Sequence, residues 1–176
     1  MDAAHKNPPL TEVEQSFLRR AEQYCSAEER CLTAVRGKLV GWGATEHSVN
    51  RICVSLLEQG FVDDQRYANM YCESKVRTQG WGRIKIAYQL RTKSLHSAVI
   101  DKALSNIDKE LYTNNLRKAA RDKWGELPHD DYARSRNKVI AHLSSRGYTL
   151  GEIMSEIDSI VESSQESQQW LAEVDA

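Results

Sequence analysis

The chain has 176 residues, 40% of them hydrophobic, and a formal net charge of −1 at pH 7, so it is long and apolar enough to bury a core. Nine glycines, three prolines and the absence of any run of alternating β-branched residues exclude a mainly β protein and predict an all-α fold. The sequence contains neither an apolar stretch of membrane-spanning length nor the apolar region of a signal peptide, and we therefore expect a cytoplasmic protein that does not contact membranes.

Apolar periodicity and capping residues predict nine helices between a flexible N-terminal arm (1–10) and an acidic, Ser/Gln-rich tail (163–176). The predicted segments are 11–25, 27–40, 46–59, 64–79, 82–92, 97–106, 109–125, 131–145 and 150–162. Three of them show capping-box spacing, in which two residues three apart satisfy free amides reciprocally; these are Thr11–Glu14, Ser26–Glu29 and Thr149–Glu152. Gly60, Gly80 and Gly147 follow periodic segments, where a left-handed residue ends a helix.

One apolar register occurs three times, centred on Leu39, Leu90 and Leu143, which lie 51 and 53 residues apart. Apolar residues recur four places before each leucine and five, ten and fourteen places after it. They are Val35, Ile86 and Val139; Ala44, Leu95 and Tyr148; Val49, Ile100 and Ile153; and Cys53, Leu104 and Ile157. The register predicts three tandem three-helix units, over 11–61, 62–107 and 108–162, that form an elongated, curved helical repeat. Arrays of this kind usually serve as binding surfaces.

The stretch VDDQRYA, residues 62–68, places Asp63 beside Asp64 and raises the question of a metal or catalytic pair. Such a pair needs a further carboxylate or histidine converging on it, and the sequence has no recognisable partner motif. An aspartate just before an amphipathic segment instead accepts hydrogen bonds from the free amides of a helix N-terminus. We therefore interpret both acids as the start of a helix.

The cysteines and histidines show no metal-ligand spacing. We expect the cysteines to be buried free thiols; they are Cys25, Cys31, Cys53 and Cys72. No Walker-type glycine loop occurs either. The sequence therefore predicts a binding protein with no metal, no cofactor and no enzymatic activity.

Three ordered motifs resemble the signatures of the RecX family. They are Val62-Asp63-Asp64-Gln65-Arg66-Tyr67-Ala68; Gly80-Trp81-Gly82-Arg83-Ile84, followed by Leu90, Lys93 and Leu95; and Leu143-Ser144-Ser145-Arg146-Gly147-Tyr148. Gln89 departs from the family pattern where a glutamate is usual, and Ser94 departs from it where a glycine is usual. A glycine at 94 would allow a positive φ, so this departure bears on the local turn. The residues expected to serve the structure of the motifs are Asp63, Asp64, Tyr67, Gly80 and Gly147.

The resemblance implies a partner, because RecX proteins are regulators of the bacterial recombinase RecA and most often inhibit it. They lodge in the groove of the RecA filament on single-stranded DNA and contact neighbouring protomers. We accordingly expect the chain to bind RecA and this filament as a monomer, and to lower ATP hydrolysis and strand exchange in recombination, DNA repair and the SOS response.

The basic middle of the chain is the expected contact surface. Residues 66–102 carry a net charge of +6, whereas residues 147–176 carry −7. Basic side chains interleaved with aromatic ones suit a negatively charged partner. The side chains expected to contact the filament or its DNA are Arg66, Arg77, Arg83, Lys85, Arg91, Lys93 and Arg146. Arg66 could equally pair with an acid near the start of its own helix.

Two other functions stay open, a direct DNA-binding regulator and a helical scaffold for another protein. The near-neutral net charge argues against the first. So do Glu152, Glu156 and Asp158, which would repel DNA from the helix–turn–helix-like segment at 142–157. A weak direct contact between the basic middle and DNA remains compatible with the sequence.

Overall fold

The structure is a computed structural model that describes residues 8–128 and 131–174, with side chains described as far as residue 163. Within these residues the chain forms nine α-helices and no strands, which confirms the predicted all-α fold. The helices are α1 (Glu12–Ala27), α2 (Leu32–Gly41), α3 (Glu46–Glu58), α4 (Asp64–Gln79), α5 (Arg83–Thr92), α6 (Ser97–Ser105), α7 (Lys109–Gly125), α8 (Tyr132–Arg146) and α9 (Leu150–Val174).

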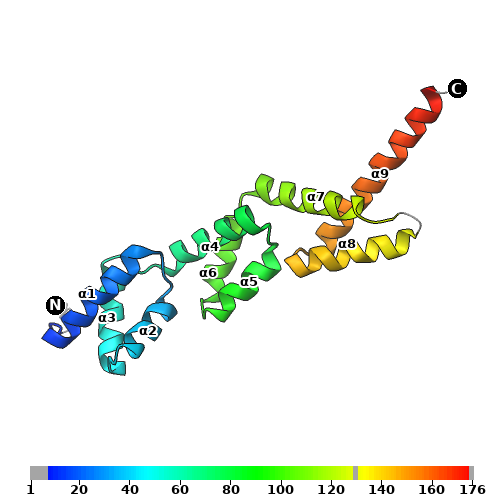
Figure 1. Ribbon diagram of the computed structural model, residues 1–176. Helices are drawn as coiled ribbons and strands as arrows, with labels where there is room; N and C mark the ends of the chain where they lie inside the picture. Colours follow the sequence, from blue (N-terminus) through cyan, green and yellow to red (C-terminus); the bar gives the residue numbers. More distant parts are fainter. Residues whose placement is uncertain (1–7, 129–130, 175–176) are drawn as a thin grey trace.

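The helices pack in three consecutive groups, which we call the first (α1–α3), the second (α4–α6) and the third (α7–α9). Within each group every helix contacts the other two, and between groups α4 contacts α7. The groups follow one another along an elongated molecule, with the two ends of the chain far apart (Figure 1). This is the expected helical repeat, whereas the division into units at 11–61, 62–107 and 108–162 stays a prediction.

The repeated apolar register forms the core. The three central leucines at 39, 90 and 143 are fully buried, and so are the residues four places before them. Among the register positions Leu104 is half-buried, because α6 turns the adjacent Ala103 into the core instead. All other positions of the register are buried, as the apolar pattern predicts.

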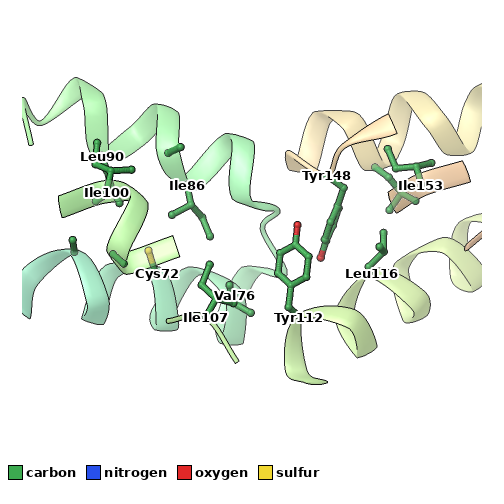
Figure 2. Packing of buried hydrophobic residues seen from close by; sticks show 14 of the residues in the cluster. Cys72, Val76, Ile86, Leu90, Ile100, Ile107, Tyr112, Leu116, Tyr148 and Ile153 are labelled. Atoms are coloured by element: carbon green, nitrogen blue, oxygen red, sulfur yellow. The ribbon is translucent and has the colours of Figure 1, made fainter. Parts of the chain in front are cut away.

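The buried side chains form two clusters. One fills the first group and includes Val62 from the segment that follows it. The other runs through the second and third groups and includes Cys31 from the first. Figure 2 shows Tyr112 and Tyr148 between the buried side chains of the second and third groups, which therefore share one continuous core. The four cysteines are buried free thiols, as expected.

The turn between the second and third helices of each group is built in the same way. Its left-handed residue is Gly43, Ser94 or Gly147, with φ of 93°, 60° and 91°. The following amide donates to the carbonyl five residues earlier, which is the central leucine of the register. Ser94 adopts this conformation although it carries a Cβ, so the turn keeps its geometry where the family has glycine. The third helix is then capped by the side chain of Thr45, His96 or Thr149.

The expected start of the second helix is wrong. α1 continues to Ala27 and α2 begins at Leu32, so residues 28–31 link the two helices. Ser26 therefore lies inside α1, where its hydroxyl donates to the Glu22 carbonyl across 2.8 Å instead of capping α2. The Glu29 carboxylate, expected in the same capping box, instead accepts hydrogen bonds from Arg66.

The other two capping boxes are confirmed, at Thr11–Glu14 and at Thr149–Glu152. Gly60 and Gly80 end their segments with φ of 73° and 58°. The expected end of the last helix at residue 162 is wrong, because the backbone of α9 stays helical over 163–174. Most of the expected N-terminal arm lies outside the described residues.

Candidate functional site

The N-terminus of α2 is capped by a residue of the second group. Cys31 occupies its N-cap position and makes no side-chain capping bond. The Leu32 amide instead donates to Asp64 Oδ1 across 2.8 Å. Asp63 caps its own helix, since its Oδ1 accepts from two amides at the start of α4, at 2.8 and 3.0 Å. The two acids do serve helix starts, as expected, but the starts belong to two different helices.

An ion pair closes the same contact. The Arg66 guanidinium donates to both carboxylate oxygens of Glu29, at 2.8 and 2.9 Å, and to the Gly60 carbonyl at 3.0 Å. The hydrogen bond with Glu29 is the main cause that raises the pKa of Arg66. We call the contacts of Leu32 with Asp64 and of Glu29 with Arg66 the first joint, because they connect the first and second groups.

The N-terminus of α5 is capped by the third group. Its N-cap residue is Gly82, which has no side chain to accept a hydrogen bond. The Gly82 amide donates to the Arg146 carbonyl across 2.8 Å, and the Ile84 amide donates to the Gly147 carbonyl across 3.0 Å. Amides that would be free at the start of a helix are thus satisfied by the chain that leaves α8.

The two segments approach so closely that both glycines are required. A Cβ at Gly82 would lie 2.2 Å from the carbonyl carbon and oxygen of Gly147, and a Cβ at Gly147 would lie 2.4 Å from the Cβ of Lys85. Backbone atoms in a packed interior cannot give way as a flexible side chain can. We call the contact of the α5 N-terminus with residues 146–148 and Tyr112 the second joint.

Two buried tyrosines complete the second joint. The Tyr112 hydroxyl accepts from the Arg83 amide at 3.3 Å and donates to Glu152 at 3.4 Å. Its ring meets Tyr148 edge to face, with 5.3 Å between the centroids, and the Tyr148 hydroxyl donates to the Gly80 carbonyl at 3.0 Å. Burial raises the pKa of each hydroxyl to about 12, so both keep the proton that they donate.

The second helix of the third group supplies its own cap. Asp131 precedes α8, and its side chain accepts from the Arg134 amide at 3.0 Å. Sequence reasoning missed this difference among the three groups, although a signal is present: the residue before α8 can cap a helix, whereas Cys31 and Gly82 cannot.

Two of the seven basic side chains expected to contact a partner bind acids within the joints. Arg66 belongs to the first joint. Arg83 lies at the second, where its Nη1 is 3.3 Å from Glu152 and its guanidinium lies 4.1 Å above the Tyr112 ring. Sequence reasoning missed Tyr112 as a joint residue, because Arg83, whose amide donates to its hydroxyl, lies in another predicted unit.

Two further members of the set also lie at the second joint. Lys85 Nζ donates to the Ser145 carbonyl across 3.2 Å. Arg146 Nε donates to His142 Nε2 across 3.2 Å, and its Nη1 lies 3.5 Å from the Gln79 carbonyl. Burial, with the charges of nearby Arg146 and Lys123, lowers the pKa of His142, which favours the neutral ring that this hydrogen bond needs.

The remaining three lie away from the joints. Arg77 pairs with Glu73 across 2.6 Å on the exposed face of α4. Arg91 is exposed and forms no ion pair with any residue in the described part of the chain. Lys93 is half-buried, with its ammonium 5.8 Å from the centre of the Tyr71 ring. The structure therefore does not bring the seven side chains together in one patch.

A row of ammonium groups and aromatic rings runs along the second group. Its members, which we call the lysine–aromatic row, are Lys93, Tyr67, Tyr71, Lys75, Trp81 and Lys85. Each ammonium nitrogen lies 4.7 to 5.9 Å from the centroids of its neighbouring rings, and the Tyr67 and Tyr71 ring centroids lie 6.1 Å apart. None of the three ammonium groups pairs with a carboxylate of the described residues. The row is therefore a positive feature of the middle of the molecule.

In residues 8–128 and 131–174, no group of His, Cys, Asp or Glu is placed to hold a metal ion. No helix within the same ranges is both long and apolar enough to cross a membrane. The two joints hold the three groups of helices in line, and the lysine–aromatic row presents positive charge on the middle group.

Comparison with known proteins places residues 63–104 in the family described as RecX, second three-helix domain. The regulatory protein RecX of Clostridium acetobutylicum is 31% identical over 132 residues, which cover 71% of this chain and 61% of that protein. The regulatory protein RecX of Clostridium perfringens (strain 13) is 30% identical over 145 residues, which cover 81% of this chain and 66% of that protein. The chain thus spans somewhat less than two thirds of the length of these relatives.

The crystal structure of RecX from Lactobacillus salivarius has the same fold, with a TM-score of 0.79 and 22% sequence identity over 85% of this chain and 97% of that one. The motifs noted in the sequence lie in the two joints and in the segments that form them. Fold, motifs and sequence identity agree, and the chain belongs to the RecX family of regulatory proteins.

Proposed function

We propose that this chain binds RecA on single-stranded DNA and lowers ATP hydrolysis and strand exchange by the filament. Membership of the RecX family supports the choice of partner, because RecX proteins are regulators of RecA. The chain would act by binding alone, as a cytoplasmic monomer without a cofactor, and ATP hydrolysis would remain the activity of RecA.

The observation that carries the proposal is that the motifs resembling the RecX signatures build the joints. Asp64 and Arg66 connect the first and second groups, and Gly82 and Gly147 connect the second and third. These residues hold the helices in an extended line. An extended line can contact neighbouring protomers of a filament at once, which strengthens binding through effective concentration.

Bridging of protomers provides the mechanism. A chain that spans two protomers blocks the addition of the next protomer, or fixes an arrangement from which protomers leave. Either effect shortens the filament and reduces ATP hydrolysis in proportion to the protomers lost. One bound chain would therefore affect many protomers.

The seven basic side chains remain candidates for the contact, but they divide into two classes. Arg77, Arg91 and Lys93 lie outside the joints and can be replaced without disturbing them. Substitution of the joint residues also changes the shape of the array; for example, Arg83→Glu would place a carboxylate against Glu152. Loss of function in such a variant would not identify a contact.

The proposal is tested by titrating this chain into RecA that is hydrolysing ATP on single-stranded DNA. We expect hydrolysis to fall at well under one chain per RecA protomer. Binding of the chain alone to the same DNA is the control, and we expect it to be weak at physiological salt. Undiminished hydrolysis at a molar excess of the chain, with RecA from the same organism, would contradict the proposal.

A further inference from the structure

The solvent-facing side of α5 differs from the equivalent side of α2 and α8. Ile84 and Tyr88, one helical turn apart, are 54% and 62% exposed, and Arg91 is exposed on the next turn. We call these three residues the α5 outer face. The repeat register gives the matching exposed residues in the other groups: Thr33, Gly37 and Val40 on α2, and Asn137, Ala141 and Ser144 on α8.

The fold itself does not require large apolar side chains at the positions of Ile84 and Tyr88, because the first and third groups have small or polar residues at both. Neighbouring exposed apolar side chains indicate an interaction site more strongly than scattered single ones do. Tyrosine and arginine are also the residue types most enriched where binding energy concentrates in protein interfaces. The middle group is therefore distinguished by a face with the composition of a contact site.

The charges around the α5 outer face have one sign. α5 contains no acidic residue, and its basic residues are Arg83, Lys85 and Arg91. Arg83 is neutralised by Glu152, but Arg91 has no ion-pair partner among the described residues. Lys85 belongs to the lysine–aromatic row, whose other two ammonium groups, Lys75 and Lys93, lie on the same group of helices and form no ion pair among the described residues. A complementary surface would carry carboxylates around an apolar depression.

The residues of the α5 outer face and of the lysine–aromatic row suit a protein partner better than a nucleic acid. Single-stranded nucleic acid binds where aromatic rings are free to stack on bases. The rings of the lysine–aromatic row are already covered by ammonium groups, and Tyr67 and Tyr71 also stack on each other. On the outer face itself Ile84 offers no ring. An aliphatic and a phenolic side chain beside an arginine suit a protein pocket with an acidic rim.

We propose that the α5 outer face, Ile84, Tyr88 and Arg91, is the docking surface of this chain for an acidic-rimmed apolar pocket on a RecA protomer of the filament. This inference rests on the proposed function and adds the place and chemistry of the contact. The middle group then supplies the anchor, and the flanking groups reach along the filament from it.

The test compares two double variants in binding to RecA filaments assembled on oligo(dT). Ile84→Ser/Tyr88→Ser alters the face, and Leu57→Ser/Met70→Ser removes two apolar side chains of similar exposure, 44% and 53%, from other helices. We expect the face variant to bind on the order of thirtyfold more weakly, as for loss of an interface hot spot, and the control to bind like the unaltered chain. Arg91→Glu should also weaken binding, while all variants keep the original circular dichroism.

The outcomes separate the two proposals. Equal filament binding by the face variant and the unaltered chain would overturn the docking surface and leave the proposed function standing. Absence of filament binding by the unaltered chain would overturn the proposed function itself. Loss of binding to bare oligo(dT) in the face variant would show a nucleic-acid site instead. A dimer of the unaltered chain in sedimentation that the face variant abolishes would show a second copy as the occupant.

Discussion

The two joints do the same task at equivalent places with different chemistry. Each caps the N-terminus of the second helix of one group with atoms from the next group. The first joint does so with a carboxylate, Asp64, and reinforces it with the Arg66–Glu29 ion pair. The second does so with main-chain carbonyls at Arg146 and Gly147.

This difference determines what each joint tolerates. A side-chain cap can be weakened in steps, by truncating an acid or by screening a pair that is 43% exposed at Arg66. A main-chain cap does not use the side chains of the residues that supply the carbonyls. It fails when any Cβ is added at the point of closest approach, so we expect the second joint to be the less forgiving of the two.

The largest effect should come from Gly82→Ala, which breaks the second joint. Its Cβ would lie 2.2 Å from the Gly147 backbone, so the third group must move and lose the hydrogen bonds of the joint. We expect a loss of about 3 kcal/mol in the free energy of unfolding, measured in urea. Gly125→Ala is the matched control, because nothing lies within 4 Å of the Cβ there. Equal stability of the two variants would contradict the close packing of this joint.

Asp64→Ala should break the first joint at a smaller cost, about 1 to 2 kcal/mol, since it removes one N-cap. The neighbouring Asp63→Ala also removes a cap, but the cap of α4. The two variants are distinguished by hydrogen exchange at the Leu32 amide, which should become faster in Asp64→Ala alone. Faster exchange of Leu32 in both variants, or in neither, would show that Asp64 does not cap α2.

Ser94→Gly should stabilise the protein, because it relieves strain in a turn that lies outside both joints. Ser94 holds a φ of 60°, which a glycine adopts without strain. We expect a gain of about 1 kcal/mol in the free energy of unfolding, and a similar loss for the reverse change Gly43→Ser at the equivalent turn, where no atom lies within 4 Å of the added Cβ. Thermal unfolding of the two variants measures both changes; shifts of the same sign would contradict the equivalence of the turns.

The smallest effect should be a pH dependence at the second joint. The pKa of His142 is lowered from its ordinary 6.5 by burial and by the charges of Arg146 and Lys123, so the unfolded chain takes up a proton at a higher pH than the folded chain does. The stability from neutral His142 is therefore fully present above pH 6.5 and is lost as pH falls below it towards the folded pKa. His142→Gln should lose less stability than the unaltered chain between pH 7 and 5, measured by urea unfolding, and an equal loss in both would contradict this dependence.

The fold was predictable where the physical causes are local. A helical period sets the register of Leu39, Leu90 and Leu143, and a left-handed turn follows each of them within four residues. Ser26 shows the limit of local reasoning. The sequence around it has the spacing of a capping box, but Glu29 forms a stronger contact with Arg66, and α1 continues through the position.

The candidate site was predictable only in part, because its contacts join distant residues. Leu32 and Asp64 are separated by 32 positions, and Arg83 and Glu152 by 69. No periodicity indicates such pairs, so the sequence alone suggested that the basic residues of the middle segment are free surface charges. The structure shows that Arg83 contacts Glu152 and the Tyr112 ring, whereas Arg91 forms no ion pair with any described residue.

Capping of one group by the next is most directly tested by hydrogen exchange at the first amides of the second helices. The Gly82 and Ile84 amides have no acceptor within α5, and neither does the Ala133 amide within α8. If the second joint forms as described, Gly82 and Ile84 exchange as slowly as amides inside the helices, whereas Ala133 exchanges quickly. Exchange of Gly82 and Ile84 at the rate of Ala133 would contradict the account, because those amides would then be free.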